Sequence, residues 1–298
     1  MIHNLNKKFN TFFGVICLGF LCNPIKGQQL PNMNPTPQKK GYELVWSEEF
    51  DRDGAPDTSN WGFEKGFVRN HELQWYQEEN AVVIDGKLII TGTRERRASP
   101  IFDPSHPDWR HQREFIDYTS SSLHTGGKFE FKFGWVEVRA KIDTAMGMWP
   151  AIWTLGVDRG WPANGEIDIM EYYLSNGIPT ILANAAWAHA RERAAWDEVK
   201  IPLSDISLGN ADWVKHFHIW EMDWTSSYIR IYLDGRLLNE IDLSRTINPD
   251  GFNPFHQPHY LLLNLAIGSN GGDPSGTDFP RTFEVDYVRI YKEVPSTD

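Results

Sequence analysis

Three acidic residues, Glu166, Asp168 and Glu171, stand within one short segment of β-branched, aromatic and large apolar residues. Such neighbours favour a β-strand. On an α-helix the three side chains would point apart, because successive residues are rotated by about 100°. On a regular strand Glu166 and Asp168 share one face, and Glu171 points to the other. We therefore expect a β-bulge at Ile169–Met170, since one extra residue would turn all three carboxylates to the same face.

Carboxylates that crowd on one face repel one another, and this repulsion raises the pKa of at least one of them. A glycosidase needs such a pair, with one carboxylic acid to protonate the leaving oxygen and one carboxylate to attack the anomeric carbon. Two other interpretations remain open on the acids alone. Clustered carboxylates also suit a hard metal cation, and they occur on solvated edge strands.

Aromatic and amide side chains close to the acids favour the glycosidase interpretation. The run Gly147–Trp153 supplies two indole rings, and the segment Asn70–Tyr76 adds aromatic and amide groups. Sugar clefts combine flat apolar rings with a few hydrogen-bonding groups. The candidate substrate-binding residues are Trp149, Trp153, Trp187, Asn70, Gln74 and His189.

The strand that carries the acids needs partners, and period-two alternation of apolar residues recurs from Tyr42 to Tyr291. Asp85-Gly86 and Asp234-Gly235 each separate two apolar runs, and Asp-Gly suits the positive φ angles of a two-residue hairpin turn. Further strands are expected at residues 42–46, 151–155, 217–224, 260–266 and 283–291. Many short strands and few helices indicate an all-β protein, either a sandwich or a barrel.

The segment from Phe129 to Ile142 is expected to be strand with one irregularity. Its apolar residues first occupy odd positions and then even ones, and the switch falls at Gly134-Trp135. A turn or bulge at this point would reverse which face of the strand is buried.

The composition is that of a folded globular chain. Of its 298 residues, 41% are hydrophobic and 23% are charged, and 13 are Trp. The formal net charge of −11 disfavours nucleic acid or an anionic membrane surface as partner, because both are bound through basic residues. The composition does not change along the chain and no long linker interrupts it, which predicts one domain at residues 41–293, followed by a short tail at 294–298.

The N-terminus has the pattern of an export signal. Lys7 and Lys8 precede an apolar run, residues 12–21, that is too short to span a bilayer. We expect residues 1–27 to be a signal peptide and residues 28–40 a flexible leader, so that the mature protein is secreted, periplasmic or at the cell surface. Cys17 and Cys22 both lie in the signal, which leaves the mature chain without disulfides. A lipid anchor at Cys22 is not expected, because no small residue precedes it.

The run Glu-Ile-Asp-Ile-Met-Glu at residues 166–171, preceded by Gly-x-Trp-Pro-Ala-x-Trp at residues 147–153, resembles the signature of the family 16 glycoside hydrolases. It has the bulged form found among laminarinases and agarases. The resemblance extends from residues 44–50 to residues 285–291. It implies a β-jelly-roll sandwich of two curved antiparallel sheets, with the substrate groove on the concave face.

The same resemblance implies a retaining endo-β-glycanase. Glu166 would be the nucleophile, Glu171 the general acid and then base, and Asp168 an electrostatic helper between them. Retention predicts that the two glutamate carboxyls lie about 5 Å apart. No cofactor is needed for catalysis, and Asp286 matches the usual carboxylate ligand of a structural calcium ion in the family. A monomer is expected.

The favoured substrate is a neutral polysaccharide or oligosaccharide, because the negative charge of the chain would repel a heavily sulfated polymer. The resemblance points to a laminarinase-like endo-β-1,3(4)-glucanase. Laminarinase relatives often carry Gly-Thr-x-His on the strand after the acids, and residues 181–189 depart from that pattern. An endo-β-galactosidase acting on galactan, agar-type or host mucin and keratan glycans is therefore the alternative. A non-catalytic carbohydrate-binding protein is a third possibility, against which the three retained acids argue.

Four further segments are expected near the cleft. Arginines cluster between residues 94 and 113, where they would form a solvated loop or contact an acidic sugar. They are Arg94, Arg96, Arg97, Arg110 and Arg113. The insert Ser99–Tyr118 and the loop His189–Asp205 are expected to shape the ends of the cleft, and the glycine-rich run 268–272 to lie beside it.

Overall fold

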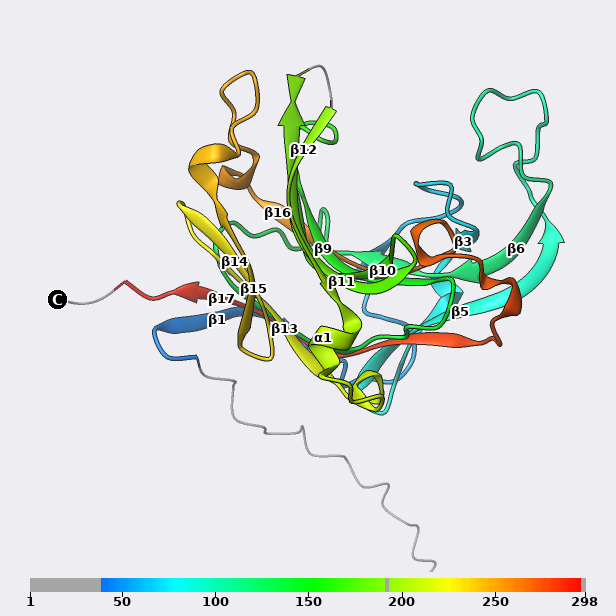
Figure 1. Cartoon of the computed structure of the whole chain (residues 1–298), viewed down its shortest axis with the longest axis horizontal. Coiled ribbons are helices and arrows are strands. Elements are labelled where there is room, and N and C mark those ends of the chain that lie inside the picture. The colour runs from blue at the N-terminus through cyan, green and yellow to red at the C-terminus, as the bar shows by residue number, and fades with distance from the viewer. Residues whose placement is uncertain (1–38, 191–192, 296–298) are drawn as a thin grey trace, which may run out of the picture. The chain divides into compact units, whose positions relative to one another are not determined.

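The computed structural model describes residues 39–190 and 193–295, and the regular secondary structure of these residues consists almost entirely of two β-sheets (Figure 1). The larger sheet has the order β15-β14-β13-β8-β17-β5-β6-β3, with β1 also paired to β17 and β4 to β5. Its strands are β1 (Tyr42–Glu48), β3 (Gln74–Tyr76), β4 (Ala81–Ile84), β5 (Lys87–Ala98), β6 (Phe115–Ser120), β8 (Gly134–Lys141), β13 (His218–Trp224), β14 (Tyr228–Leu233), β15 (Arg236–Asp242) and β17 (Arg281–Glu293).

The smaller sheet has the order β12-β11-β10-β9-β16-β7-β2, and all of its pairs are antiparallel. Its strands are β2 (Gly62–Phe63), β7 (Ser122–His124), β9 (Met148–Gly156), β10 (Glu166–Ser175), β11 (Ile178–His189), β12 (Arg193–Pro202) and β16 (His259–Ile267). In the described residues one short α-helix, α1 (Leu203–Ser207), follows β12. The prediction of an all-β jelly-roll sandwich of two curved sheets is confirmed.

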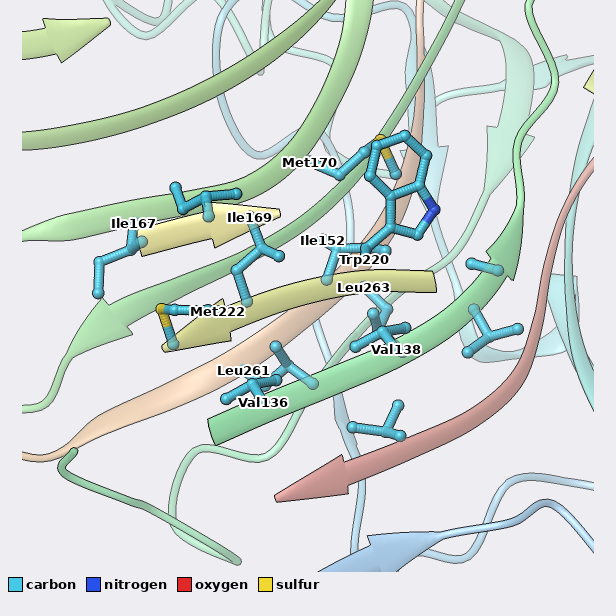
Figure 2. Packing of buried hydrophobic residues seen from close by; sticks show 14 of the residues in the cluster. Val136, Val138, Ile152, Ile167, Ile169, Met170, Trp220, Met222, Leu261 and Leu263 are labelled. Atoms are coloured by element: carbon cyan, nitrogen blue, oxygen red, sulfur yellow. The ribbon is translucent and has the colours of Figure 1, made fainter. Parts of the chain in front are cut away.

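The core lies between the two sheets, where β10 contacts β13 and β11 contacts β15. Figure 2 shows hydrophobic side chains of β9, β10 and β16 packed against those of β8 and β13. Val136 and Val138 of β8 are fully buried, while Glu137 between them is half-buried. Each fully buried aliphatic side chain contributes about 2 kcal/mol through its removal from water. The alternation of apolar residues therefore decides which face of each strand packs in the core and which face is free to carry polar side chains.

The two predicted hairpins are present. Ile84 pairs with Lys87 across Asp85-Gly86, and Leu233 pairs with Arg236 across Asp234-Gly235. All four turn residues have positive φ, between 49° and 75°. The five further strands expected from alternation correspond to β1, β9, β13, β16 and β17.

The expectation of strand from Phe129 onward is wrong for its first part, because β8 begins only at Gly134. Phe131 forms an isolated bridge to His259 of the smaller sheet, and the chain then enters the larger sheet. At the crossing Phe133 and Gly134 have φ of 59° and 112°. A Cβ on Gly134 would lie 2.1 Å from the carbonyl oxygen of Tyr291, so this position requires glycine.

The expected signal peptide, with Cys17 and Cys22, and the leader up to residue 38 lie outside the described residues, as do residues 296–298. Strands run from Tyr42 to Glu293, within the range expected for the domain. None of the helices in the described part of the chain is both long and apolar enough to cross a membrane.

Candidate active site

The acidic segment forms β10, and its pairing is interrupted between Asp168 and Glu171. Toward β11 the register shifts between these two residues, and toward β9 it shifts between Asp168 and Met170. Three residues of β10 are fully buried in the core, namely Ile167, Ile169 and Met170. Figure 2 shows their side chains on the core side. The predicted bulge is thus present, and it turns Glu166, Asp168 and Glu171 to the opposite face.

The three carboxylates line one cavity of about 680 Å³ on that face. Ala151, Trp153 and Leu262 form a small apolar cluster there, separate from the core between the sheets. Trp149 and Trp153 are each only 7% exposed, whereas Trp161 and Trp196 are 54% and 45% exposed. All four indoles line the cavity. The site therefore has a buried floor beneath exposed aromatic side chains.

Each acid has a defined hydrogen-bond donor. The Nε1 of Trp161 donates to Glu166 Oε2 at 2.9 Å, and the Nε1 of Trp149 donates to Glu171 Oε1 at 2.9 Å. Asn184 Nδ2 lies 3.4 Å from both Asp168 Oδ2 and Glu171 Oε2. Asn184 occupies this place because it pairs with Asp168 in the β10–β11 ladder.

Burial raises the pKa of all three carboxyls above their ordinary values. The charge of Glu171 raises the pKa of Glu166 and Asp168 further, and Asp168 shares a hydrogen bond with Glu171. Groups this close titrate as one set, so the protons belong to the set and not to a single residue. The site can therefore hold both a protonated acid and an ionised carboxylate near neutral pH.

A segment before β3 forms another part of the cavity wall, with Arg69, Asn70 and Glu72 among the lining residues. Glu72 is 2% exposed, and its burial raises the pKa of its carboxyl. Glu72 accepts hydrogen bonds from Gln74 at 2.7 Å and Asn70 at 3.2 Å. The Arg69 guanidinium lies 4.9 Å from the ring centre of Trp153. This wall adds one cation and one more carboxylate to the cavity.

A buried chain of hydrogen bonds links this wall to the floor. Trp153 Nε1 donates to Asn264 Oδ1 at 2.7 Å, and Asn264 Nδ2 donates to the Tyr76 hydroxyl at 3.0 Å. The Tyr76 hydroxyl in turn lies 3.4 Å from Glu72 Oε2. Gln74 also accepts from the backbone of Ile267 at 2.7 Å and is fully buried. Gln74 thus supports Glu72 and does not line the cavity.

Of the predicted substrate-binding residues, Trp149, Trp153 and Asn70 line the cavity, and Gln74, Trp187 and His189 do not. Trp187 follows Ala186, which pairs with Glu166 on the cavity face, so its own side chain packs against the core between the sheets. His189 is exposed at the last position of β11.

Several cavity residues were not predicted from the sequence. They are Arg69, Glu72, Trp161, Tyr173, Asn184, Trp196, Glu198 and Asn264. The pattern of β11 could have indicated Asn184, because alternation places it on the same face of the strand as Ala186, which lies opposite Glu166. Ser269 and Asn270 line the cavity, as expected for the glycine-rich loop.

Asp286, the calcium ligand expected from the resemblance, forms an ion pair. Its Oδ2 accepts a hydrogen bond from Arg139, and this guanidinium supplies the positive charge at that carboxylate. Calcium takes six to eight oxygen ligands. Within residues 39–190 and 193–295, no group of three His, Cys, Asp or Glu side chains is placed to hold a metal ion. The calcium site expected from the resemblance stays a prediction.

The arginine cluster mainly binds the protein's own groups. Arg94 donates to the carbonyls of Pro274 and Ser275 at 2.8 Å. Arg96 pairs with Asp117 at 2.8 Å, and Arg97 pairs with Glu95 at 2.9 Å. These contacts give the arginines structural partners beside a groove that lies outside the cavity.

Comparison with known proteins gives one consistent result. Residues 111–289 match the family model of glycosyl hydrolases family 16. The chain is 33% identical to a β-glucanase of Rhodothermus marinus, over 92% of this chain and 94% of that protein. It is 32% identical to glucan endo-1,3-β-glucosidase A1 of Niallia circulans over 86% of this chain, and it spans 39% of that longer protein.

A solved structure from a study of endo-acting O-glycanases, which prominent members of the human gut microbiota express to initiate mucin breakdown, is also similar. It superimposes with a TM-score of 0.77 at 32% identity, covering 87% of this chain and 94% of that chain.

Proposed function

This chain belongs to glycosyl hydrolase family 16 and is an O-glycosyl hydrolase, and from this premise we propose that it is a retaining endo-β-glucanase acting on a neutral polysaccharide. One observation carries the proposal: the bulge in β10 brings Glu166, Asp168 and Glu171 into one tryptophan-lined cavity. The similarity to a β-glucanase and an endo-1,3-β-glucosidase supports glucan as the substrate.

Glu166 is proposed as the nucleophile that attacks the anomeric carbon. The indole N–H of Trp161 donates to its carboxylate and thus favours the ionised form. Glu171 is proposed as the acid that gives its proton to the leaving oxygen, since burial keeps its pKa high. Asp168 is proposed as an electrostatic helper, because its hydrogen bond to Glu171 lets the pair share a proton.

The charges of the two glutamates explain how one residue can serve as acid and then as base. When Glu166 forms its bond to the sugar, its negative charge disappears. The pKa of Glu171 then falls, since a like charge no longer opposes its ionisation. Glu171 is thereby ready to take a proton from the water that releases the product.

The charge of the cavity supports a neutral sugar. Glu72, Glu166, Asp168, Glu171 and Glu198 all line it. Arg69 is the only Lys or Arg among the described lining residues. An anionic substituent at the centre would therefore meet more negative than positive groups, and its entry would be unfavourable.

An endo-β-galactosidase acting on galactan or mucin-type glycans is the second candidate. Two observations favour it: the similarity to the structure from the O-glycanase study, and the cavity side of β11. There β11 places Asn184 and the small Ala186 beside Asp168 and Glu166. Asn184 and Ala186 belong to residues 181–189, which depart from the Gly-Thr-x-His pattern of laminarinase relatives.

The test of function is hydrolysis of a panel that contains laminarin, mixed-linkage glucan, agarose, keratan-type glycans and mucin O-glycans. Ladders of oligosaccharides from the glucans support the proposal, and products from the galactose-containing glycans alone support the second candidate. Product anomers followed by NMR immediately after cleavage test retention. An inverted first product would contradict the assigned mechanism.

The roles of the glutamates are tested by substitution. Glu166→Gln should abolish hydrolysis while oligosaccharide binding persists, and unchanged turnover would refute the assignment. With Glu171→Ala, azide should restore cleavage of an activated aryl glycoside and give a product of retained configuration, because azide replaces water at the glycosyl-enzyme. Glu240→Gln, on β15 of the larger sheet, is the control and should leave turnover unchanged.

We also propose that the protein is secreted after removal of residues 1–27 and acts as a monomer. Expression of the full chain, followed by fractionation and N-terminal sequencing of the mature protein, tests the first point. Sedimentation of that protein tests the second. A mature N-terminus at Met1 or a stable dimer would contradict the respective proposal.

A further inference from the structure

The connection between β5 and β6 is much longer than a hairpin requires. Residues 99–114 leave the ends of the two strands and rise above them at the side of the molecule that carries β3 (Figure 1). The base is closed by a hydrogen bond from Ser99 N to Glu114 O at 2.8 Å. A second one runs from Asp103 N to His111 O at 2.8 Å. Two- to five-residue loops suffice for antiparallel neighbours, so the excursion needs another explanation.

The excursion binds the backbone of the segment 68–72, which we call the rim segment. Arg110 Nε donates to Val68 O at 3.0 Å, and Arg113 Nη2 donates to His71 O at 2.8 Å. Arg113 also donates to the carbonyl of Glu72. The rings of Trp109 and His71 are 4.6 Å apart. The Arg113 guanidinium lies 4.7 Å from the Trp109 ring centre.

The rim segment has a backbone that needs such support. Asn70 and His71 are consecutive non-glycine residues with φ of 55° and 53°, in the left-handed region that costs conformational energy. Every carbonyl of the segment has a partner. Besides the three bound by the arginines, Arg69 O accepts from Glu72 N at 3.1 Å and Asn70 O accepts from Ser269 Oγ at 2.8 Å. The strained turn is therefore held from two sides, by the excursion and by the glycine-rich loop.

The rim segment carries Arg69, Asn70 and Glu72 into the cavity that contains the three acids. A strained backbone of this kind persists only when several contacts from the surrounding structure hold it in place. We propose that Arg110 and Arg113 are positioning residues: they hold the rim segment so that Arg69, Asn70 and Glu72 meet the glycan in a fixed geometry. The inference rests on the proposed function, and it assigns to the excursion control over how tightly the glycan is bound.

The kinetic test compares Arg113→Gln and Arg113→Lys with the wild-type protein on the polysaccharide that it hydrolyses. Contacts made equally to substrate and transition state affect KM and not kcat. Arg113→Gln should therefore raise KM by about tenfold with kcat nearly unchanged. Arg113→Lys should be intermediate, because an ammonium group can still donate to one carbonyl. Arg230→Gln is the control, since Arg230 also lies over an aromatic ring, 4.0 Å from Tyr228, but belongs to β14 of the larger sheet.

A binding test is independent of turnover. Calorimetric titration with an oligosaccharide product compares Glu166→Gln with the double variant Glu166→Gln, Arg113→Gln, and the second should bind about tenfold more weakly. Hydrogen exchange at the amides of residues 69–73 should accelerate in the Arg113 variants. If Arg113→Gln fails to fold, Arg110→Lys takes its place in all three measurements.

Several results would overturn the inference. Unchanged KM and affinity would show that the rim segment keeps its geometry without the arginines. A fall in kcat with KM unchanged would show that the arginines act on the chemical step and not on glycan binding. Equal loss in Arg113→Lys and Arg113→Gln, with slow exchange at residues 69–73, would also contradict it. Wild-type protein that hydrolyses nothing in the glycan panel would refute the proposed function instead, so the two failures are distinguishable.

Discussion

Trp161→Phe should move the pH dependence of catalysis while leaving the aromatic wall in place. The indole N–H is the donor to Glu166 Oε2, at 2.9 Å, and it lowers the pKa of a carboxyl that burial has raised. A hydrogen bond to a charged group contributes about 1.5–3 kcal/mol, and one pKa unit corresponds to about 1.4 kcal/mol. Since Trp161 is 54% exposed, water will replace part of the lost donor. We therefore expect the pKa of Glu166 to rise by about one unit.

The sign of the effect follows from the role of Glu166. A nucleophile must be ionised, so a higher pKa reduces the active fraction at a given pH. The acid limb of the profile of kcat/KM against pH should therefore shift to higher pH by about one unit, and the variant should approach wild-type activity only at alkaline pH. The assay is hydrolysis of the preferred glucan between acid and alkaline pH, at substrate concentrations well below KM.

Trp196→Phe is the matched control, because Trp196 lines the same cavity and is similarly exposed, but it has no hydrogen bond to Glu166. It should alter KM and leave the acid limb in place. An unmoved acid limb in Trp161→Phe would refute the reasoning, as would an equal shift in both variants.

Three further outcomes are expected. Asp168→Asn should raise Tm at pH 8 and not at pH 4. A carboxyl whose pKa is raised by folding binds more protons in the folded state, so the stability of the wild-type protein falls as the pH rises above the pKa of this carboxyl in the unfolded chain. Equal Tm values for the variant and the wild type at pH 8 would contradict this. Trp187→Leu should lower Tm with KM unchanged, since this indole packs on the core side of β11; a raised KM would place it in the cleft. Gly134→Ala should destabilise by more than about 3 kcal/mol in denaturant titration, whereas Gly177→Ala, with φ of 78° and no atom within 4 Å of its Cβ, should cost only about 1 kcal/mol; similar losses would refute the steric argument.

The local pattern of residues was sufficient to predict the bulge in β10. The side-chain period of a strand is two, so three acids at positions i, i+2 and i+5 can share a face only if one extra residue lies between the second and the third. The structure has this register shift between Asp168 and Glu171. The hairpin turns at Asp85-Gly86 and Asp234-Gly235 were predictable for a similar reason, because the required φ angles restrict the residue types.

The alternation of apolar residues gave a wrong prediction where the chain passes from one sheet to the other. Phe129, Phe131 and Phe133 alternate like a strand, yet β8 begins only at Gly134. Aromatic side chains can pack with the same spacing along a crossing segment, and Phe129 stacks on Trp46 with ring centres 5.0 Å apart. The pattern shows that every second residue is buried, and it does not show which sheet buries it.

The prediction that Trp187 binds substrate was limited in the same way, because alternation does not show which face of a strand borders the cavity. Its distance in sequence from the acids is compatible with either face of β11, and only the pairing of Ala186 with Glu166 places it in the core. The rim segment could not be assigned either, because its partners in Arg110, Arg113 and Ser269 are distant in sequence.

The sequence by itself determined the chemistry of this protein: which strand bears the carboxylates, that they converge, and the family to which the chain belongs. Those properties depend on residue type and on spacing within a few positions, where the geometry of the backbone is known in advance. Tertiary structure alone decided which tryptophans line the cavity, which carboxyl accepts a hydrogen bond from which indole, and how the rim segment is supported. These depend on the register and packing of strands and loops that meet only when the chain has folded.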